Sequence, residues 1–186
     1  SIHDQKSDRV WTELAWSPDI RSWYRISPGT PLIPNSEKVL DYDYGCVYAC
    51  AYPIFKGKGK EILLYYGGSD WLHFSWRNGF LCLATMRPDG FAGYAQVSEN
   101  RLAQVVTKNL PYSSQKIKIT ADIKQGGFVK VYVLDSKKQL IAESKTIFEN
   151  VTEKELELNA EVNLDNVKLK FEFSKATIYS FSYSDL

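Results

Sequence analysis

Apolar and polar residues alternate along most of the second half of the chain, a pattern typical of strands with one buried and one solvated face. The strands predicted from this alternation are residues 117–123, 129–133, 139–144, 155–162, 167–173 and 178–183. We expect Gly126-Gly127 to form the turn between the first two of them. Several strands joined by short turns favour an antiparallel β-sandwich over residues 111–186.

The outer faces of two of these strands carry opposite charges. Glu155, Glu157 and Glu161 alternate with apolar residues, and Lys168 and Lys170 do so in the following strand. An antiparallel pair places such residues opposite one another, so we predict ion pairs between residues 155–162 and 167–173. In the last strand, the side chains of Tyr179, Phe181 and Tyr183 are expected to share one face, because they occupy alternate positions.

The first half of the chain also lacks helical periodicity, and its apolar segments contain more aromatic residues. The predicted strands are residues 45–54, 61–66, 79–86, 92–96 and 102–107. The Lys-Gly-Lys-Gly-Lys segment at 56–60 is interpreted as a charged hairpin tip, because it lacks the spacing and the terminal Ser or Thr of a phosphate-binding loop. The chain is therefore predicted to be all-β.

Composition and charge narrow the classes of partner. The chain has 23 Lys and Arg against 22 Asp and Glu, without a basic stripe for a phosphate backbone, so we expect no nucleic-acid partner. Apolar runs are shorter than the about 18 residues that span a membrane, so no membrane partner is expected. The three cysteines are expected to be buried free thiols, and the alternative is a disulfide between Cys82 and either Cys46 or Cys50. The chain begins at Ser1 without an initiator Met, and we expect a processed or truncated product.

A weak internal repeat links two parts of the first half. Residues 14–19 (LAWSPD) are echoed by residues 83–89 (LATMRPD), and each copy is followed by an aromatic residue. Repeated four-stranded units of this kind are typical of β-propeller blades. Chance similarity of two strand-turn segments is the alternative explanation.

Several segments together resemble one known family. In the first half, the matching strings are residues 10–26 (VWTELAWSPDIRSWYRI), 43–49 (DYGCVYA), 64–68 (LYYGG) and 83–91 (LATMRPDGF). In the second half they are residues 131–135 (VYVLD) and 178–181 (IYSF). They resemble the end of a five-bladed β-propeller in glycosidase-like proteins related to glycoside hydrolase families 32 and 43, in which a β-sandwich follows the propeller. This resemblance covers nearly the whole chain.

The resemblance implies an architecture and a function. Residues 1–110 would form the last one and a half blades of the propeller and residues 111–186 the sandwich. The acids that perform catalysis in the related hydrolases would lie on earlier blades, so we assign no catalytic residue to this chain. The expected partners are a carbohydrate and N-terminal propeller blades of the same polypeptide or of a separate chain. The expected location is extracytoplasmic, either periplasmic or secreted.

Two carboxylates are candidates for contact with a sugar. Glycoside hydrolysis requires two carboxyl groups across the scissile bond. Asp41 and Asp43 directly precede a predicted strand, and their spacing of two residues allows both to point to one side. Asp43 is the preferred acceptor of a hydrogen bond from a substrate hydroxyl. The alternative is a polar loop leading into the strand, because Asp is common in turns.

A second candidate region is the loop at residues 69–78, which contains two tryptophans, an arginine and a histidine. Aromatic rings stack on the apolar faces of sugars, and polar side chains bind the hydroxyl groups. The predicted substrate-binding residues here are Trp71, His73, Trp76 and Arg77. The alternative is a loop that packs its aromatic residues beneath itself or against another domain.

Other chemistries find little support in the sequence. With two histidines there is no His-Glu-x-x-His zinc helix, and no Gly-x-Ser-x-Gly elbow occurs, so neither metal nor cofactor is expected. The favoured function is therefore that of the C-terminal portion of a glycosidase-like, carbohydrate-active protein that is not catalytic alone. The alternative is a non-catalytic carbohydrate-binding module or a structural and interaction module.

Overall fold

The computed structural model describes residues 8–57, 60–98 and 100–184, and every regular element in them is a β-strand. The strands form several sheets, none of which is closed. This confirms the all-β prediction. The chain divides into two compact units, Ser1–Phe91 and Ala92–Leu186.

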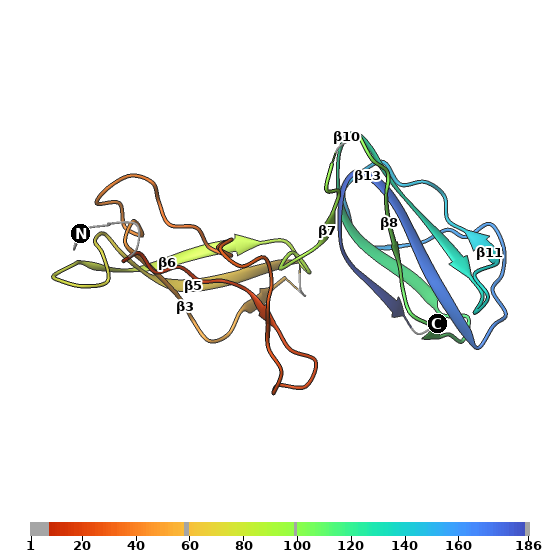
Figure 1. Ribbon diagram of the computed structural model, residues 1–186, viewed down its shortest axis with the longest axis horizontal. Helices are drawn as coiled ribbons and strands as arrows, with labels where there is room; N and C mark the ends of the chain where they lie inside the picture. Colours follow the sequence, from red (N-terminus) through yellow and green to blue (C-terminus); the bar gives the residue numbers. More distant parts are fainter. Residues whose placement is uncertain (1–7, 58–59, 99, 185–186) are drawn as a thin grey trace. The chain divides into compact units, whose positions relative to one another are not determined.

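A four-stranded antiparallel sheet centred on one strand forms the body of the first unit (Figure 1). The strands of this unit are β1 (Ala15–Trp16), β2 (Tyr24–Arg25), β3 (Cys46–Ala49), β4 (Ile54–Lys56), β5 (Glu61–Ser69) and β6 (Gly79–Met86). β6 pairs with β5 along its whole length, whereas β3 and β4 pair with the two halves of β5. β4 and β5 form the hairpin expected at 56–60, of which residues 58 and 59 lie outside the described part of the chain.

The two faces of this sheet differ in how well they are covered. The covered face carries a small core of Ile33, Val47 and Tyr66, with four partly buried apolar residues around it. Residues directly opposite in the register share a face, and the other face, which we call the open face, is also apolar. The open face consists of Tyr48, Ile54, Leu63, Tyr65, Leu81 and Leu83. Leu81 in β6 is 80% exposed.

Two long strands organise the second unit. Its strands are β7 (Tyr94–Ala95), β8 (Ala103–Val106), β9 (Leu110–Pro111), β10 (Lys116–Leu134), β11 (Leu140–Glu143), β12 (Val151–Glu155) and β13 (Asn166–Ser184). β10 and β13 pair from Lys116↔Ser184 to Leu134↔Lys168 (Figure 1). β11 and β12 pair with β10, and β7, β8 and β9 pair with β13.

The placement of β7 and β8 corrects a prediction. Residues 92–96 and 102–107 were expected to complete the sheet of the first half, within a domain ending at residue 110, but their strands β7 and β8 pair with β13. The physical reason is packing, because Ala103 and Val105 contact the large core of the second unit. The boundary between the compact units therefore follows Phe91.

The Gly126-Gly127 pair bends a strand instead of ending it. The predicted turn at this point is wrong, because β10 continues through it and both halves of β10 pair with β13. The register shifts between Ile123 and Phe128, and Gly126 adopts a φ of 72°. A Cβ on Gly127 would lie 2.6 Å from the carbonyl oxygen of Ser174, so a glycine is required at this close approach.

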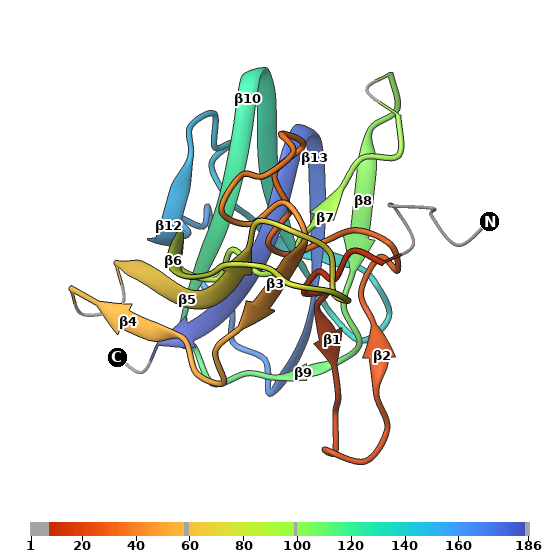
Figure 2. The ribbon, with the colours of Figure 1, turned by 90° about the vertical axis from the view of Figure 1, so that its left-hand side faces the viewer.

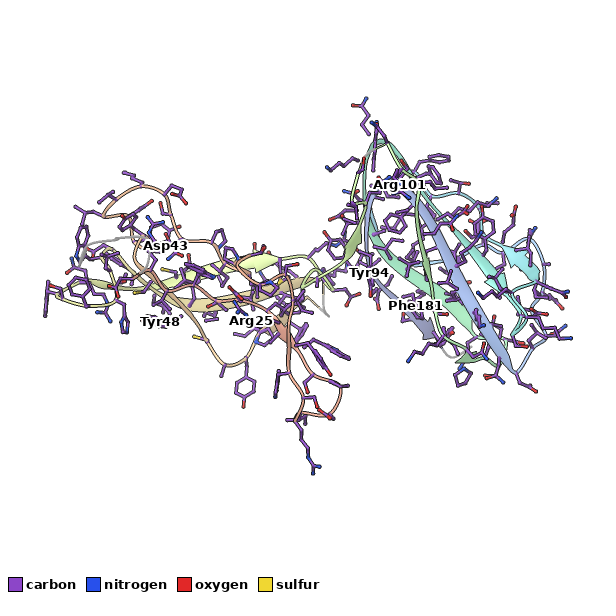
Figure 3. The ribbon with its side chains drawn as sticks, in the orientation of Figure 1. Arg25, Asp43, Tyr48, Tyr94, Arg101 and Phe181 are labelled. Atoms are coloured by element: carbon purple, nitrogen blue, oxygen red, sulfur yellow. The ribbon has the colours of Figure 1, made fainter. Side chains whose placement is uncertain are left out.

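The bend allows side chains from the two halves of the long strands to meet in one core. The rings of Phe171 and Phe181 have centroids 5.6 Å apart, although they lie on opposite sides of the bend in β13 (Figure 3, where Phe181 is labelled). The buried members of this core are Tyr112, Ile117, Ile119, Ala121, Ile123, Val129, Val131, Val133, Ala142, Ile147, Val151, Leu156, Val162, Val167, Leu169, Phe171, Phe173, Ala176 and Ile178. The second unit thus has a far larger core than the first.

Two finer predictions for the second unit also need correction. A strand is expected at 155–162, but the strand in this region, β12, ends at Glu155 and pairs with β10. Glu155 therefore forms its ion pair with Lys116 of β10 and not with the strand at 167–173. Tyr179 does not share a face with Phe181 and Tyr183. A register shift after Thr120 places Ile178 opposite Ala121, and the hydroxyl of Tyr179 donates to Asp122.

Other expectations are confirmed by the register. β11 lies within the strand predicted at 139–144 and pairs with β10, and β6 coincides with the strand predicted at 79–86. Cys46, Cys50 and Cys82 are free thiols, as expected, but the expectation that all three are buried is wrong: Cys46 is buried, Cys82 is partly buried and Cys50 is exposed.

Candidate functional site

Residues 70–78 connect β5 to β6 as the predicted hairpin loop, and its two ends are joined by one carboxylate. Asp70 accepts hydrogen bonds from the backbone N–H of Asn78 at 2.9 Å and from its side-chain amide at 2.7 Å. The hydrogen bond from the Asn78 side chain lowers the pKa of Asp70. The loop is therefore closed at its neck by a polar clamp.

The base of the loop rests on the segment that leads into β3. The backbone N–H of Gly45 donates to the carbonyl of Ser69 at 2.8 Å, and the Ser69 hydroxyl donates to the carbonyl of Trp71 at 2.8 Å. A Cβ on Gly45 would overlap the backbone of Trp71, so this close approach requires a glycine. The local sequence thus brings residues 45 and 71 into direct contact.

Trp71 is the inner aromatic residue of the loop. Its ring lies 6.2 Å from that of Tyr44, and the guanidinium of Arg9 lies 3.9 Å from the centroid of the Tyr44 ring on which it packs. Arg9, Tyr44 and Trp71 therefore form a series of contacting planar groups. Trp71 is partly buried, so it supports the loop as well as contributing to its surface.

The tip of the loop is fixed by backbone hydrogen bonds to a distant residue. The N–H of His73 donates to the carbonyl of Asp8 at 3.2 Å, and the N–H of Phe74 donates to the Asp8 carboxylate at 3.1 Å. The guanidinium of Arg77 donates to the carbonyl of His73. Ser75 has a φ of 71°, a strained conformation that persists only where the surroundings impose it. The backbone of the tip is therefore held in one arrangement.

The tip exposes side chains that could serve a ligand. Trp76 is 86% exposed, and Phe74 and His73 are also exposed. Among the hydrogen bonds of the described residues, none involves the indole N–H of Trp76. Trp76 therefore offers a ligand both the face of its indole ring and its N–H donor, from a loop whose backbone is fixed.

Asp41 and Asp43 precede β3, as the sequence predicts, and their carboxylates are bonded within the chain. The Asp43 carboxylate is 5% exposed and accepts hydrogen bonds from the Tyr66 hydroxyl at 2.8 Å and the Ser36 backbone N–H at 3.3 Å. Asp41 accepts from the Ser36 hydroxyl at 2.8 Å and from the N–H of Tyr42 at 3.1 Å. All four carboxylate oxygens are engaged within the chain, which favours the alternative of a structural polar loop.

Tyr66, whose hydroxyl donates to the Asp43 carboxylate, has a shifted pKa. Removal from water, and then the hydrogen bond to Asp43, raise the pKa of Tyr66 well above its usual range. Burial likewise raises the pKa of the neighbouring Cys82 thiol. Neither group is therefore a nucleophile at neutral pH.

Sequence reasoning missed two contributors to the loop. Phe74 was not singled out, although it stands between His73 and the strained Ser75. Asp8 lies 66 positions from Phe74 along the chain, and no local pattern signals a contact of that separation. The predicted residues Trp71, His73, Trp76 and Arg77 do belong to one loop, whereas Asp41 and Asp43 serve a different segment.

No group of three or more His, Cys, Asp or Glu side chains is placed to hold a metal ion within residues 8–57, 60–98 and 100–184. In that same part of the chain, no helix has the length and hydropathy needed to cross a membrane.

The chain was compared with known proteins at three levels. No protein-family model matches it, and no match was found among curated proteins or solved structures.

Proposed function

We propose that this chain is the carbohydrate-binding C-terminal portion of a glycosidase-like polypeptide, and that residues 70–78 form part of the rim of its sugar site. One observation carries the proposal. Trp76 is 86% exposed on a loop whose backbone is fixed at its neck, base and tip. A rigid loop that presents an aromatic ring loses little conformational entropy when a ligand stacks on it.

The groups around Trp76 match the chemistry of a sugar. The indole ring would stack on the C–H face of a pyranose or furanose ring. His73 and Arg77 would hydrogen-bond the hydroxyl groups, because the Arg77 guanidinium donates to backbone carbonyls through one nitrogen and retains its other N–H groups. Trp71 would support the loop from below.

Catalysis is not part of the proposed role of this chain. Asp41 and Asp43, the best-placed pair in the sequence, have all of their carboxylate oxygens engaged in hydrogen bonds that fasten residues 36–43. We therefore assign them a structural role and assign no catalytic residue. The acids for hydrolysis would come from the remainder of the polypeptide.

The first unit is interpreted as propeller-blade material and the second as an antiparallel β-sandwich. The four-stranded antiparallel sheet around β5 and its apolar open face support the first interpretation, because blade sheets pack face to face with their neighbours. Among the described residues, β6 pairs only with β5, so its outer edge is available to another strand. The partner would be N-terminal blades of the same polypeptide or of a separate chain.

Binding is tested by titrating the protein with neutral oligosaccharides while following tryptophan fluorescence and heat. Trp76→Ala should weaken binding about two- to twelvefold, because aromatic stacking contributes about 0.5–1.5 kcal/mol. Tyr52→Ala is the matched control, since Tyr52 is 84% exposed in the same unit but lies outside the loop. Absence of binding by the unaltered protein, or equal affinity of the Trp76→Ala variant, would contradict the proposal.

A second candidate function, a purely structural interaction module, is favoured by the open face. The test compares this chain with a version extended by any residues that its gene encodes before Ser1. If the extension contains blades that cover the open face, the urea midpoint of the first unit rises, and Leu81→Lys lowers it only in the longer protein. Leu140→Lys, an exposed leucine of the second unit, is the control. An unchanged midpoint in the longer protein would count against blade packing.

A further inference from the structure

The β1–β2 hairpin carries a second group of exposed aromatic residues, outside the proposed sugar site. Trp16 in β1 lies directly opposite Tyr24 in β2, and their ring centroids are 6.0 Å apart with a tilt of 34°. Both rings are more than half exposed, as is that of Trp23. Figure 2 shows β1 and β2 side by side as a separate two-stranded sheet.

The turn of this hairpin is fixed by local hydrogen bonds, since no residue of β1 or β2 is buried. The Asp19 carboxylate accepts from the backbone N–H groups of Arg21 at 2.9 Å and Ser22 at 2.7 Å, and these bonds lower its pKa. The indole N–H of Trp23 donates to the carbonyl of Ile20 at 3.1 Å. Asp19 is therefore fully used within the turn.

The base of the hairpin is fixed by the other carboxylate. Glu13 accepts hydrogen bonds from Arg25 at 2.9 Å and from the indole N–H of Trp11 at 3.0 Å, and it also binds the backbone N–H of Gly29 at 3.0 Å. The Arg25 hydrogen bond is the main reason that the pKa of Glu13 is lowered. The positive charge of Arg25, which is labelled in Figure 3, is thus balanced by the Glu13 carboxylate.

Three side-chain groups of the hairpin that can donate a hydrogen bond remain without a partner. Within the described residues, the guanidinium of Arg21, the indole N–H of Trp16 and the hydroxyl of Tyr24 make no hydrogen bond or ion pair. Both carboxylates of the hairpin are hydrogen-bonded within it and Arg25 is paired with Glu13, so Arg21 is the charged side chain that remains available beside the exposed ring faces. Its complement is a ligand that has acceptors, negative charge and flat apolar faces.

We propose that the β1–β2 hairpin binds an acidic polysaccharide, with Trp16 and Tyr24 stacking on its sugar rings and Arg21 pairing with a carboxylate or sulfate group. An apolar protein surface is a poorer occupant, because it would remove Arg21 from water without a counter-charge. This site does not depend on residues 70–78, whose proposed ligand is a neutral sugar, so the two proposals stand or fall separately.

The experiment uses calorimetric titration of the whole protein with a galacturonic acid tetramer, its fully methyl-esterified form and a sulfated galactan tetramer. Arg21→Gln should weaken binding of the acidic ligand about two- to fivefold, as for an exposed ion pair, and leave the ester unaffected. Trp16→Ala should weaken binding of both. Arg101→Gln removes an exposed arginine of the second unit and is the charge-matched control. Raising the salt concentration should weaken only the acidic ligands.

The comparison between the three ligands decides the outcome. Preference for galacturonate or for the sulfated tetramer identifies which anionic group Arg21 binds, and either preference supports the proposal. Equal affinity for the acid and the ester, no detectable binding of any acidic ligand, or an effect of Arg101→Gln as large as that of Arg21→Gln would overturn it. Trp76→Ala should leave the acidic ligand bound, which separates this result from the test of residues 70–78.

Discussion

The hydrogen bond between Tyr66 and Asp43 offers a direct test of what holds the first unit together. Tyr66 belongs to the small core on the covered face, and its hydroxyl donates to the buried Asp43 carboxylate at 2.8 Å. Tyr66→Phe removes only the hydroxyl and preserves the packing of the ring. The variant leaves one carboxylate oxygen without its donor in a place that water does not reach freely.

The expected cost follows from the charge and burial of the acceptor. A hydrogen bond to a charged group contributes about 1.5–3 kcal/mol, so we expect Tyr66→Phe to lower the free energy of unfolding of the first unit by that amount. Domains are stable by only about 5–15 kcal/mol. The first unit has seven buried apolar residues against the much larger core of the second, so it has less burial to offset such a loss.

The assay can separate the two units because all five tryptophans, Trp11, Trp16, Trp23, Trp71 and Trp76, lie in the first unit. Tryptophan fluorescence during urea unfolding therefore reports on that unit alone. For a urea slope of about 1.5–2 kcal/mol per molar, the expected loss lowers the midpoint by about 1–2 M. Tyr52→Phe, at a position that is 84% exposed, is the control and should leave the midpoint unchanged.

The same variant has a distinct pH signature. The pKa of Tyr66 is raised in the folded unit, so folding retains its proton and the associated stability is present below about pH 10, the ordinary tyrosine pKa. That stability is lost as the pH rises further, and Tyr66→Phe should therefore make the alkaline loss less steep. An unchanged midpoint at pH 7 would refute the assignment of a supporting role to this hydrogen bond.

Three further predictions concern close packing, the larger core and alkaline pH. Gly45→Ala should unfold the first unit by fluorescence, since a Cβ there overlaps the loop backbone, whereas Gly79→Ala, which has open space, should not. Phe173→Ala should cost the second unit about 3–5 kcal/mol in urea unfolding followed by circular dichroism, because Phe173 is 1% exposed. The hydrogen bond to Glu172 raises the pKa of Tyr132 to about 12, so the second unit should lose stability from about pH 10 to 12, and Tyr132→Phe should lose less over that range.

The alternation of apolar and polar residues predicted the strands better than it predicted their partners. β6 coincides with the strand predicted at 79–86, because both its length and its bounding turns are local features. β7 and β8 were assigned to the wrong sheet, since pairing with β13 joins residues separated by most of the second unit. Alternation fixes which residues of a strand share a face and says nothing of the neighbour against which that face packs.

The Gly126-Gly127 pair illustrates a second limit. Two glycines between alternating segments are consistent with a turn and with a bend, because both require a positive φ or a close backbone approach. The choice between them depends on whether β13 continues past the same point, and β13 does so through Lys175, which also has a positive φ of 46°. That information lies about 50 residues further along the chain.

The candidate site was predicted to the level of the loop and no further. Composition located Trp76 and Arg77 in a polar aromatic segment, and the hairpin geometry follows from the flanking strands. The 86% exposure of Trp76 and the hydrogen bond from the Phe74 backbone to Asp8 are features that only the folded chain shows. The sequence predicts that the Asp43 carboxylate binds a ligand. In the structure it is buried and accepts a hydrogen bond from the hydroxyl of Tyr66, which is distant in the sequence.

Both proposed sites share a construction that separates binding from stability. Residues 70–78 are held by Asp8 and Asp70, and the β1–β2 hairpin is held by Glu13 and Asp19, so in each case a carboxylate bound to backbone N–H groups takes the place of a hydrophobic core. The exposed rings of Trp76, Trp16 and Tyr24 make none of these hydrogen bonds. Their truncation should therefore weaken ligand binding at little cost in stability, whereas substitution of the carboxylates should release the loops and weaken binding indirectly. Comparing ring and carboxylate variants at each site thus distinguishes a ligand contact from a scaffold, which exposure alone does not.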